Sequence, residues 1–403
     1  MSIEYIYGYG TSIVPKGDLR NSNLKGYKAL INGEVYRGEK GFQKENLFFN
    51  NGRLLTQDVF ERSAKTSDDV EIIDLKNKLV TPALVDQHIH GGYGMDFNTA
   101  NEEEIRNFLR ETKKMGQAAV LATFVSDSID NLNKQMDIVR NVMKNPKKDE
   151  TEILGINLEG PFLSKHKSGI HSKEIILKPT VDRLKQLNLE GVKMMTIAPE
   201  EDEGYKATQY LLDKGIIVSA GHSLATAEQV RESGVTQVTH LFNAMSPLHH
   251  RVPTIANEGL FNDNIAAEVI CTPEHLDSNI VNMIMKIKPH DKIILISDAL
   301  CGTNIKDDHF KLGGKDIYIQ PDGTARDKDG ILAGSIKLQS QMAKNLTDTT
   351  NMTFADFIKY SSLNPARNLG VEEDYIIEEN ATPNITIWDK NTLEPEKTYI
   401  KGE

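Results

Sequence analysis

The chain has 403 residues, of which 26% are charged and 39% hydrophobic, a balance typical of a globular protein. Its formal net charge of −11 disfavours binding to nucleic acid, and any anionic substrate would need a local cationic pocket. There are two cysteines, no signal-peptide pattern at the start and no apolar stretch of about 20 residues, so we expect a cytoplasmic protein without disulfides or membrane segments.

The first eighty residues predict a small β domain. Residues 1–27 are rich in Gly, Asn, Tyr and Lys and weakly periodic, so we interpret them as an extension or an additional strand. From there to about Val80, short apolar runs at 29–33, 46–49 and 70–74 are separated by turn residues such as Asn50-Asn51-Gly52. Such runs between turns are typical of β-strands.

From Leu79 onward, apolar runs alternate with amphipathic segments, which is the rhythm of parallel βα units. The apolar runs are 84–90, 118–125, 153–159, 192–197, 216–222, 237–241, 265–270 and 292–298. The amphipathic segments predict helices over 102–115, 129–143, 182–187, 207–212, 226–233 and 280–287. Eight strands is the number that a (β/α)8 barrel requires.

After the eighth run, residues 302–332 are turn-rich and hairpin-like, and helical patterns return at 336–346 and 354–361. The tail 376–400 alternates like strands, so we expect it to join the N-terminal strands. The predicted fold class is therefore α/β. Residues 1–82 form an extension and part of a small β-sandwich domain, 83–370 a (β/α)8 barrel, and 371–403 the strands that complete the small domain.

Polar side chains stand where the predicted barrel strands end, which is where barrel active sites lie. His88 and His90 end the first strand and, two residues apart, point to the same face. Four further strands end in a histidine or a carboxylate: Glu159, His222, His240 and Asp298. Singly, each has a structural alternative as a half-buried or capping residue. Together they predict a metal site, and imidazole and carboxylate ligands suit both Zn²⁺ and Fe²⁺.

At these residues the sequence resembles the N-acetylglucosamine-6-phosphate deacetylases of the amidohydrolase superfamily, from about Tyr27 to the end. The most specific segments are Glu159-Gly160-Pro161 and His240-Leu241-Phe242-Asn243-Ala244-Met245, and the others are 85–92, 219–223, 297–299, 332–335 and 364–367. The resemblance implies an enzyme of amino-sugar catabolism that hydrolyses the acetamide of N-acetylglucosamine 6-phosphate to glucosamine 6-phosphate and acetate. It also implies a homodimer, with part of the phosphate site supplied by the partner subunit.

The resemblance also implies a metal set. Glu159, His222 and His240 would hold the metal found throughout the family. Some members carry Gln and Asn in place of the histidine pair and use one metal. The pair His88 and His90 therefore implies a second ion, shared with Asp298 and a bridging Glu159, so that each subunit would hold one or two Zn or Fe ions.

The catalytic and substrate-binding roles follow from the same resemblance. Metal binding lowers the pKa of water to roughly 7, which supplies a hydroxide nucleophile. Asp298 would act as general base and then as general acid, and His171 would stabilise the oxyanion. The substrate-binding residues implied by the resemblance are His171, Asn243, Ala244, Arg251, His275, Leu332, Ala333 and Gly334.

The chain departs from the family pattern at two places around the substrate. The family has Ala-Asp-Gly shortly before the phosphate-side histidine, where this chain has Cys271-Thr272-Pro273 followed by Glu274. After Arg251 the family continues Glu-Pro-Gly, and this chain has Val252-Pro253-Thr254. Two alternatives thus stay open. The enzyme could deacetylate N-acetylgalactosamine 6-phosphate or another N-acyl compound, or the chain could be a noncatalytic relative that binds a sugar phosphate.

Overall fold

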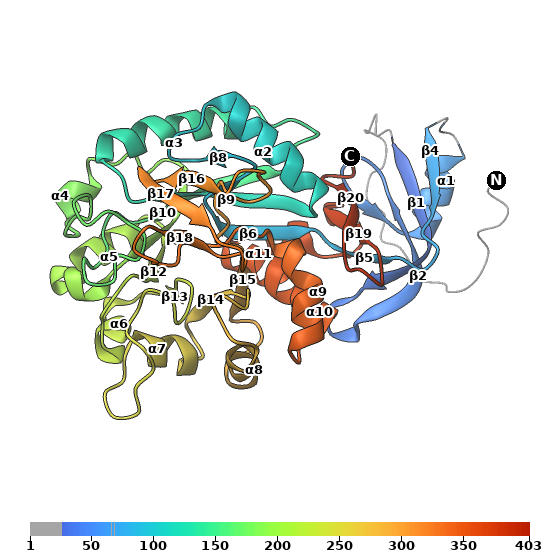
Figure 1. The fold of residues 1–403 in the computed structure, drawn as a ribbon. Coiled ribbons are helices and arrows are strands. Elements are labelled where there is room, and N and C mark those ends of the chain that lie inside the picture. The colour runs from blue at the N-terminus through green and yellow to red at the C-terminus, as the bar shows by residue number, and fades with distance from the viewer. Residues whose placement is uncertain (1–25, 66, 68) are drawn as a thin grey trace.

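A computed structural model describes residues 26–403 except 66 and 68, so the interpretation of residues 1–27 lies almost wholly outside the described residues. Its centre is an eight-stranded parallel sheet in the order β15-β14-β13-β12-β11-β10-β9-β6 (Figure 1). The strands are β6 Leu84–Ile89, β9 Gln117–Val125, β10 Glu152–Glu159, β11 Val192–Ile197, β12 Ile217–Ala220, β13 Gln237–Val238, β14 Ala266–Ile270 and β15 Ile293–Ile296. Each of the eight predicted runs overlaps one of these strands, with β9 and β10 beginning one residue earlier than predicted, and the predicted (β/α)8 barrel is confirmed.

The barrel closes between its first and last strands through backbone groups just beyond their ends. The Asp298 N–H donates to the His88 carbonyl at 3.0 Å, and the His90 N–H donates to the Ala299 carbonyl at 2.9 Å. The buried Asp86 carboxylate accepts from the Ser297 N–H at 3.3 Å. This closure places the histidine pair of the first strand beside the carboxylate that follows the eighth.

Helices cover the outside of the barrel (Figure 1). They are α2 Glu102–Lys114, α3 Ile129–Lys144, α4 Val181–Leu184, α5 Lys206–Leu212, α6 Ala227–Ser233, α7 Ile255–Phe261, α8 Ser278–Ile287, α9 Gln339–Thr349, α10 Phe354–Ile358 and α11 Asn364–Asn368. In α2, Asn101 and Glu104 form a capping box, and Ile105, Phe108 and Leu109 are buried. Within the described residues, no helix is long and apolar enough to cross a membrane.

Helix α7 is absent from the helices predicted by sequence, and its glycine explains why. Glycine lowers helix propensity by about 1 kcal/mol, so the segment shows a weak helical signal. In the structure, a Cβ on Gly259 would lie only 2.7 Å from Val238 and 2.9 Å from Leu241. Glycine therefore lets this helix pack closely against the short strand β13.

A second, seven-stranded sheet combines both ends of the described chain in the order β20-β19-β5-β1-β2-β3, with β4 paired to β1. The strands are β1 Tyr27–Tyr36, β2 Phe42–Phe49, β3 Leu54–Leu55, β4 Val70–Asp74, β5 Leu79–Pro82, β19 Ile385–Trp388 and β20 Pro395–Tyr399. The predicted tail thus pairs with the N-terminal strands. Helix α1, Gln57–Ala64, was not predicted and is capped by the Thr56 hydroxyl. The domain limits at 82/83 and 370/371 stay a prediction.

The turn-rich excursion after the eighth barrel strand forms a three-stranded antiparallel sheet, as its hairpin-like pattern indicates. Its strands are β16 His309–Leu312, β17 Lys315–Ile319 and β18 Ala325–Asp327. Phe310 and Ile317 pack with Leu300 and Val125 from the barrel. Because Val125 ends strand β9, this small sheet lies against the end of the barrel at which the candidate residues converge.

Trp388 joins the seven-stranded sheet to the barrel helices. It is fully buried, its Nε1 donates to the Thr81 hydroxyl at 2.8 Å, and its ring meets those of Phe354 and Phe357 edge-on. Trp388→Ala should lower the free energy of unfolding by about 3–5 kcal/mol, because it removes this packing and leaves a cavity. Denaturant unfolding measures the change. Tyr318→Ala on the exposed hairpin should change it by less than about 0.5 kcal/mol, and equal effects of the two variants would contradict the expectation.

Candidate metal centre

A buried carboxylate, Glu159, lies at the centre of the barrel mouth, where strand β10 ends. The Nε2 atoms of five histidines surround it, at 2.8 Å for His240, 3.0 Å for His222, 3.1 Å for His90, 3.3 Å for His171 and 3.6 Å for His88. These histidines come from four separate segments of the barrel, with His88 and His90 sharing the end of β6. Their convergence on one carboxylate is the main feature of the site.

A second carboxylate, Asp298, lies beside the histidine pair. Its Oδ1 is 3.1 Å from His90 Nε2 and 3.5 Å from His88 Nε2. Two groups of three side chains therefore have the spacing to hold a metal ion, namely His88, His90 and Asp298, and Glu159, His222 and His240. The structure thus brings together all six residues that the sequence predicts as ligands.

Three of these side chains reach the mouth because their backbone takes a left-handed conformation. The φ angles are 47° at His222, 29° at His240 and 49° at Asp298. Such a conformation costs a non-glycine residue about 1–3 kcal/mol, so the surrounding structure must enforce it. At Asp298 part of that surrounding is Gly334, where an added Cβ would lie 2.4 Å from the Asp298 carbonyl oxygen. The close approach of these two backbones thus requires glycine.

The electrostatics of the cluster favour positive charge. Burial would raise the pKa of Glu159, but His88 and His222 hold it well below its ordinary value. Burial would lower the pKa of His90, but hydrogen bonds to Asp298 and Glu159 raise it to about 9. A buried place that stabilises positive charge and offers imidazole and carboxylate donors fits a divalent cation such as Zn²⁺ or Fe²⁺.

His171 lies at the edge of the cluster and has a defined tautomer. The backbone N–H of Ser126 donates to its Nδ1 at 3.1 Å, and the Ser126 hydroxyl lies 2.8 Å from the same atom. Since Nδ1 accepts, the hydrogen-bond network assigns the proton to Nε2 on the Glu159 side. Burial lowers the pKa of His171 to about 4. A neutral imidazole with a donor N–H is thus available at the mouth.

A cavity of about 260 Å³ opens onto these groups. The predicted site residues that line it are His90, Glu159, His171, His222, His240, Asn243, Ala244, His275, Asp298, Leu332, Ala333 and Gly334. Sequence reasoning missed Leu312 and Ile331, which come from the β16–β18 region and contribute apolar walls. It also missed Ser126, although that residue directly follows the second predicted strand.

The match to protein families decides which kind of barrel this is. Residues 79–403, most of the chain, match the model of the amidohydrolase family. The chain belongs to the amidohydrolase family. Its metal-type cluster at the barrel mouth is therefore that of a metal-dependent hydrolase.

Relatives of this amidohydrolase confirm the resemblance drawn from its motifs. It is 35% identical over 330 residues to an N-acetylglucosamine-6-phosphate deacetylase of Lysinibacillus sphaericus, which covers 80% of this chain and 85% of the relative. The deacetylase structure from Thermotoga maritima superposes with a TM-score of 0.82 at 30% identity, covering 93% of this chain and 98% of that one. A mutant deacetylase from Mycobacterium smegmatis in complex with N-acetyl-D-glucosamine-6-phosphate has a TM-score of 0.82 at 25% identity, covering 94% and 99%.

Two of the residues predicted to bind the phosphate, Arg251 and His275, are not placed as free phosphate ligands in this structure. Arg251 is exposed on the loop that precedes α7 and does not line the cavity. His275 does line it, but its Nδ1 is 2.7 Å from the Thr272 hydroxyl and its Nε2 donates to the Ala333 carbonyl at 3.2 Å. Burial lowers its pKa, which keeps the ring neutral. As it stands, His275 would have to exchange a hydrogen bond to bind a phosphate.

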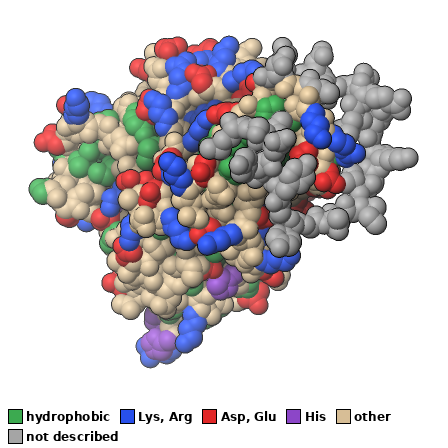
Figure 2. Space-filling view, turned by 90° about the vertical axis from the view of Figure 1, so that its right-hand side faces the viewer, with side chains coloured by type: hydrophobic (Ala, Val, Ile, Leu, Met, Phe, Trp, Pro, Cys, Tyr) green, Lys and Arg blue, Asp and Glu red, His purple; other side chains and the backbone are tan. Residues whose placement is uncertain are grey.

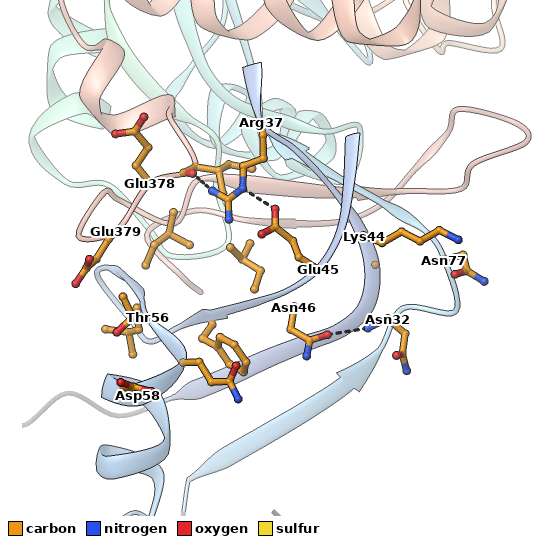
Figure 3. Close-up of a pocket in the computed structure, with 17 residues that line it drawn as sticks. Asn32, Arg37, Lys44, Glu45, Asn46, Thr56, Asp58, Asn77, Glu378 and Glu379 are labelled. Atoms are coloured by element: carbon orange, nitrogen blue, oxygen red, sulfur yellow. Dashed lines mark hydrogen bonds and ion pairs between the residues drawn. The ribbon is translucent and has the colours of Figure 1, made fainter. Parts of the chain in front are cut away.

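A larger cavity of about 850 Å³ lies in the seven-stranded sheet of this amidohydrolase (Figure 3). Among the charged residues that line it, Arg37 and Glu45 form an ion pair, with Arg37 Nε 2.6 Å from Glu45. The same guanidinium also donates to the Ile377 carbonyl. Neither metal-type group of the described residues is found there. The chemistry therefore resides in the smaller cavity at the barrel mouth.

The two cysteines take no part in that chemistry. Both Cys271 and Cys301 are buried and unbridged. Burial raises the pKa of each thiol to about 12, so neither is a thiolate nucleophile near neutral pH. They serve as small buried residues.

Proposed function

We propose that this amidohydrolase hydrolyses the acetamide of N-acetylglucosamine 6-phosphate, giving glucosamine 6-phosphate and acetate. The observation that carries the proposal is the pair of ligand groups around Glu159, which share one cavity with the neutral donor His171. The names of the relatives support the sugar phosphate as substrate.

The residues that would hold the metal are His88, His90 and Asp298 on one side, and Glu159, His222 and His240 on the other. A divalent ion bound there supplies Lewis acidity, which lowers the pKa of water and polarises a carbonyl group. Either Zn²⁺ or Fe²⁺ suits this donor set, in one copy or two. Glu159 contacts His90 of one group and His240 of the other, so it links the two groups.

His171 would stabilise the oxyanion, and Asp298 would transfer the proton. As the oxygen of water bonds to the acetamide carbon, negative charge develops on the carbonyl oxygen, and the Nε2–H of His171 can donate to it. Asp298 accepts a proton from that water. It then delivers the proton to the sugar nitrogen as the carbon–nitrogen bond breaks. Acetate and a free amine result, and Asp298 returns to its starting state.

The phosphate requires cationic partners, and no lysine or arginine of the described residues lines the cavity. Arg251 lies on a loop that projects from the body near α6 and α7, and its flanking residues Leu248 and Val252 are 40% and 58% exposed (Figure 1). Figure 2 shows basic and histidine side chains gathered at the lower tip of the molecule. We infer a homodimer in which this loop inserts toward the partner subunit and brings Arg251 to its phosphate site.

Steady-state kinetics on a substrate panel tests the reaction. N-acetylglucosamine 6-phosphate should release acetate with a kcat/KM about 100-fold above that of unphosphorylated N-acetylglucosamine, because charge-assisted hydrogen bonds to phosphate contribute about 1.5–3 kcal/mol each. N-acetylgalactosamine 6-phosphate should be slower. If it is faster, the alternative sugar is the substrate. If the metal-loaded protein binds sugar phosphate but releases no acetate, the noncatalytic alternative holds.

Replacing the proposed proton carrier tests the mechanism. Asp298→Asn keeps the shape of the side chain and removes its basicity, so kcat should fall by about 10²–10⁴-fold. Metal content is measured in the same samples, because Asp298 also belongs to a ligand group. Asp316→Asn, on the exposed hairpin, should leave kcat unchanged. Turnover by Asp298→Asn at near the wild-type rate would refute the proton-carrier role.

A substitution in the Arg251 loop, which we propose as the dimer contact, tests the homodimer. Val252→Asp places a charge in the exposed apolar surface and should convert a dimer of twice 45.0 kDa to monomer, measured by light scattering during size-exclusion chromatography. Loss of the partner's arginine should raise KM for the phosphorylated substrate. Tyr318→Asp, which introduces the same charge at another exposed residue on the hairpin sheet, serves as control. A wild-type monomer with full activity would exclude the shared site.

A further inference from the structure

A further buried carboxylate, Glu268 of strand β14, lies directly behind the two ligand groups and has no role in the reaction described above. Its side chain is fully buried inside the barrel. Its Oε2 lies 3.1 Å from Nδ1 of His88, the ring nitrogen that faces away from the cluster. The other ring nitrogen, Nε2, faces Glu159 and Asp298. Among the described residues, the Glu268 carboxylate therefore contacts the two ligand groups through His88 alone.

The hydrogen-bond network fixes which atoms donate. Glu268 Oε1 accepts from Gln87 Nε2 at 2.7 Å and from Gln237 Nε2 at 3.0 Å. With both amide nitrogens turned toward the carboxylate, both amide oxygens face Asn368, whose Nδ2 donates to them at 3.0 and 2.8 Å. A carboxylate that already accepts two amide hydrogens presents its remaining oxygen to His88 as an acceptor. The Nδ1 of His88 therefore carries a proton, and its Nε2 keeps a lone pair for a ligand.

The other three histidines of the two ligand groups are oriented differently. His222 Nδ1 faces the Lys167 carbonyl at 2.8 Å, which is a neutral acceptor. The Nδ1 atoms of His90 and His240 have no hydrogen-bond partner among the described residues. Within the part of the chain that the structure describes, His88 alone is backed by a carboxylate. A carboxylate behind a ligating imidazole raises its basicity and fixes its ring orientation.

We propose that Glu268 is a positioning residue that holds His88 as its Nδ1–H tautomer and thereby sets the metal affinity of the group formed by His88, His90 and Asp298. The proposal rests on the proposed function only in taking these residues as ligands. Gln87 and Gln237 hold the carboxylate of Glu268 in place by donating to it, and Asn368 fixes the orientation of both glutamine amides.

The variant Glu268→Gln tests this arrangement, because one glutamine amide cannot accept from both Gln87 and Gln237 and also accept from His88 Nδ1. If its oxygen faces Gln87 and Gln237, its NH₂ group meets His88 Nδ1 and forces the ring proton onto Nε2. If the amide is reversed, its NH₂ group opposes two other NH₂ groups in a buried place, which leaves donors unsatisfied. In the first orientation, Nε2 of His88 carries the proton and has no lone pair for a metal. In the second, the hydrogen bonds from Gln87 and Gln237 that hold the side chain behind His88 are lost.

The first measurement is Zn²⁺ affinity, determined by competition with a chelator and elemental analysis of the whole protein. Glu268→Gln should bind Zn²⁺ about 10–100-fold more weakly than wild type, the usual cost of losing such a partner. Glu150→Gln is the matched control, because Glu150 is likewise a buried, hydrogen-bonded carboxylate but contacts Arg106, at 2.8 Å, and none of the six ligand residues. Unchanged affinity in Glu268→Gln, or an equal loss in Glu150→Gln, overturns the proposal.

The second measurement locates the His88 proton by long-range ¹⁵N–¹H correlation spectra of Zn²⁺-loaded protein, with the His88 signals assigned by their loss in His88→Asn. Wild type should show a proton on Nδ1 of His88, and Glu268→Gln should lose that Nδ1–H signal. A purely structural role would not move this signal. If Glu268→Gln does not fold, a wild-type His88 without a proton on Nδ1 still overturns the proposal. Acetate release enters neither measurement, so failure of the proposed reaction is detected separately by the substrate panel.

Discussion

The site depends on the burial of one carboxylate, Glu159. A carboxylate removed from water at the barrel mouth must be compensated, and the compensation here is a shell of imidazole nitrogens. That shell explains the strained strand ends, because His222 and His240 reach Glu159 only by leaving the extended conformation. It also explains why a cation suits the place: histidines gathered around a carboxylate need either protons or a metal between them. The backbone strain and the buried charge that destabilise the fold at this place are thus the same features that allow it to bind a cation.

Closure of the barrel is the second constraint, since it decides which ligands meet. The first and eighth strands are held by hydrogen bonds beyond their regular ends, including that from the Asp298 N–H to the His88 carbonyl. This bond makes the histidine pair and Asp298 a single structural unit. Glu159, from the third strand, then connects this unit with the histidines that follow strands five and six. A change that loosened the closure would separate the two ligand groups without touching any ligand.

Much of this could be predicted from the sequence, because strand periodicity and the residues at strand ends are local signals. The eight strands and the six candidate ligands came from those signals alone. The sequence could not show features that arise from contacts between distant segments. The left-handed backbone of Asp298 depends on its surroundings, which include Gly334, and helix α7 depends on the close approach of Gly259 to β13. The tautomer of His171 likewise depends on Ser126, 45 residues away.

Behind the mouth, the polar network around Glu268 shows how far the demands of the site extend into the barrel. A barrel interior is usually filled by branched apolar side chains. Here Gln87, Gln237 and Glu268 occupy that layer, and Asn368 closes it from outside the sheet. A half-satisfied network of this kind would be less stable than an apolar core, so each amide must keep its orientation. The last hydrogen bond of this network joins Glu268 to His88 Nδ1. The interior of the barrel therefore contributes to the site not by touching substrate, but by deciding which nitrogen of one histidine is free to bind.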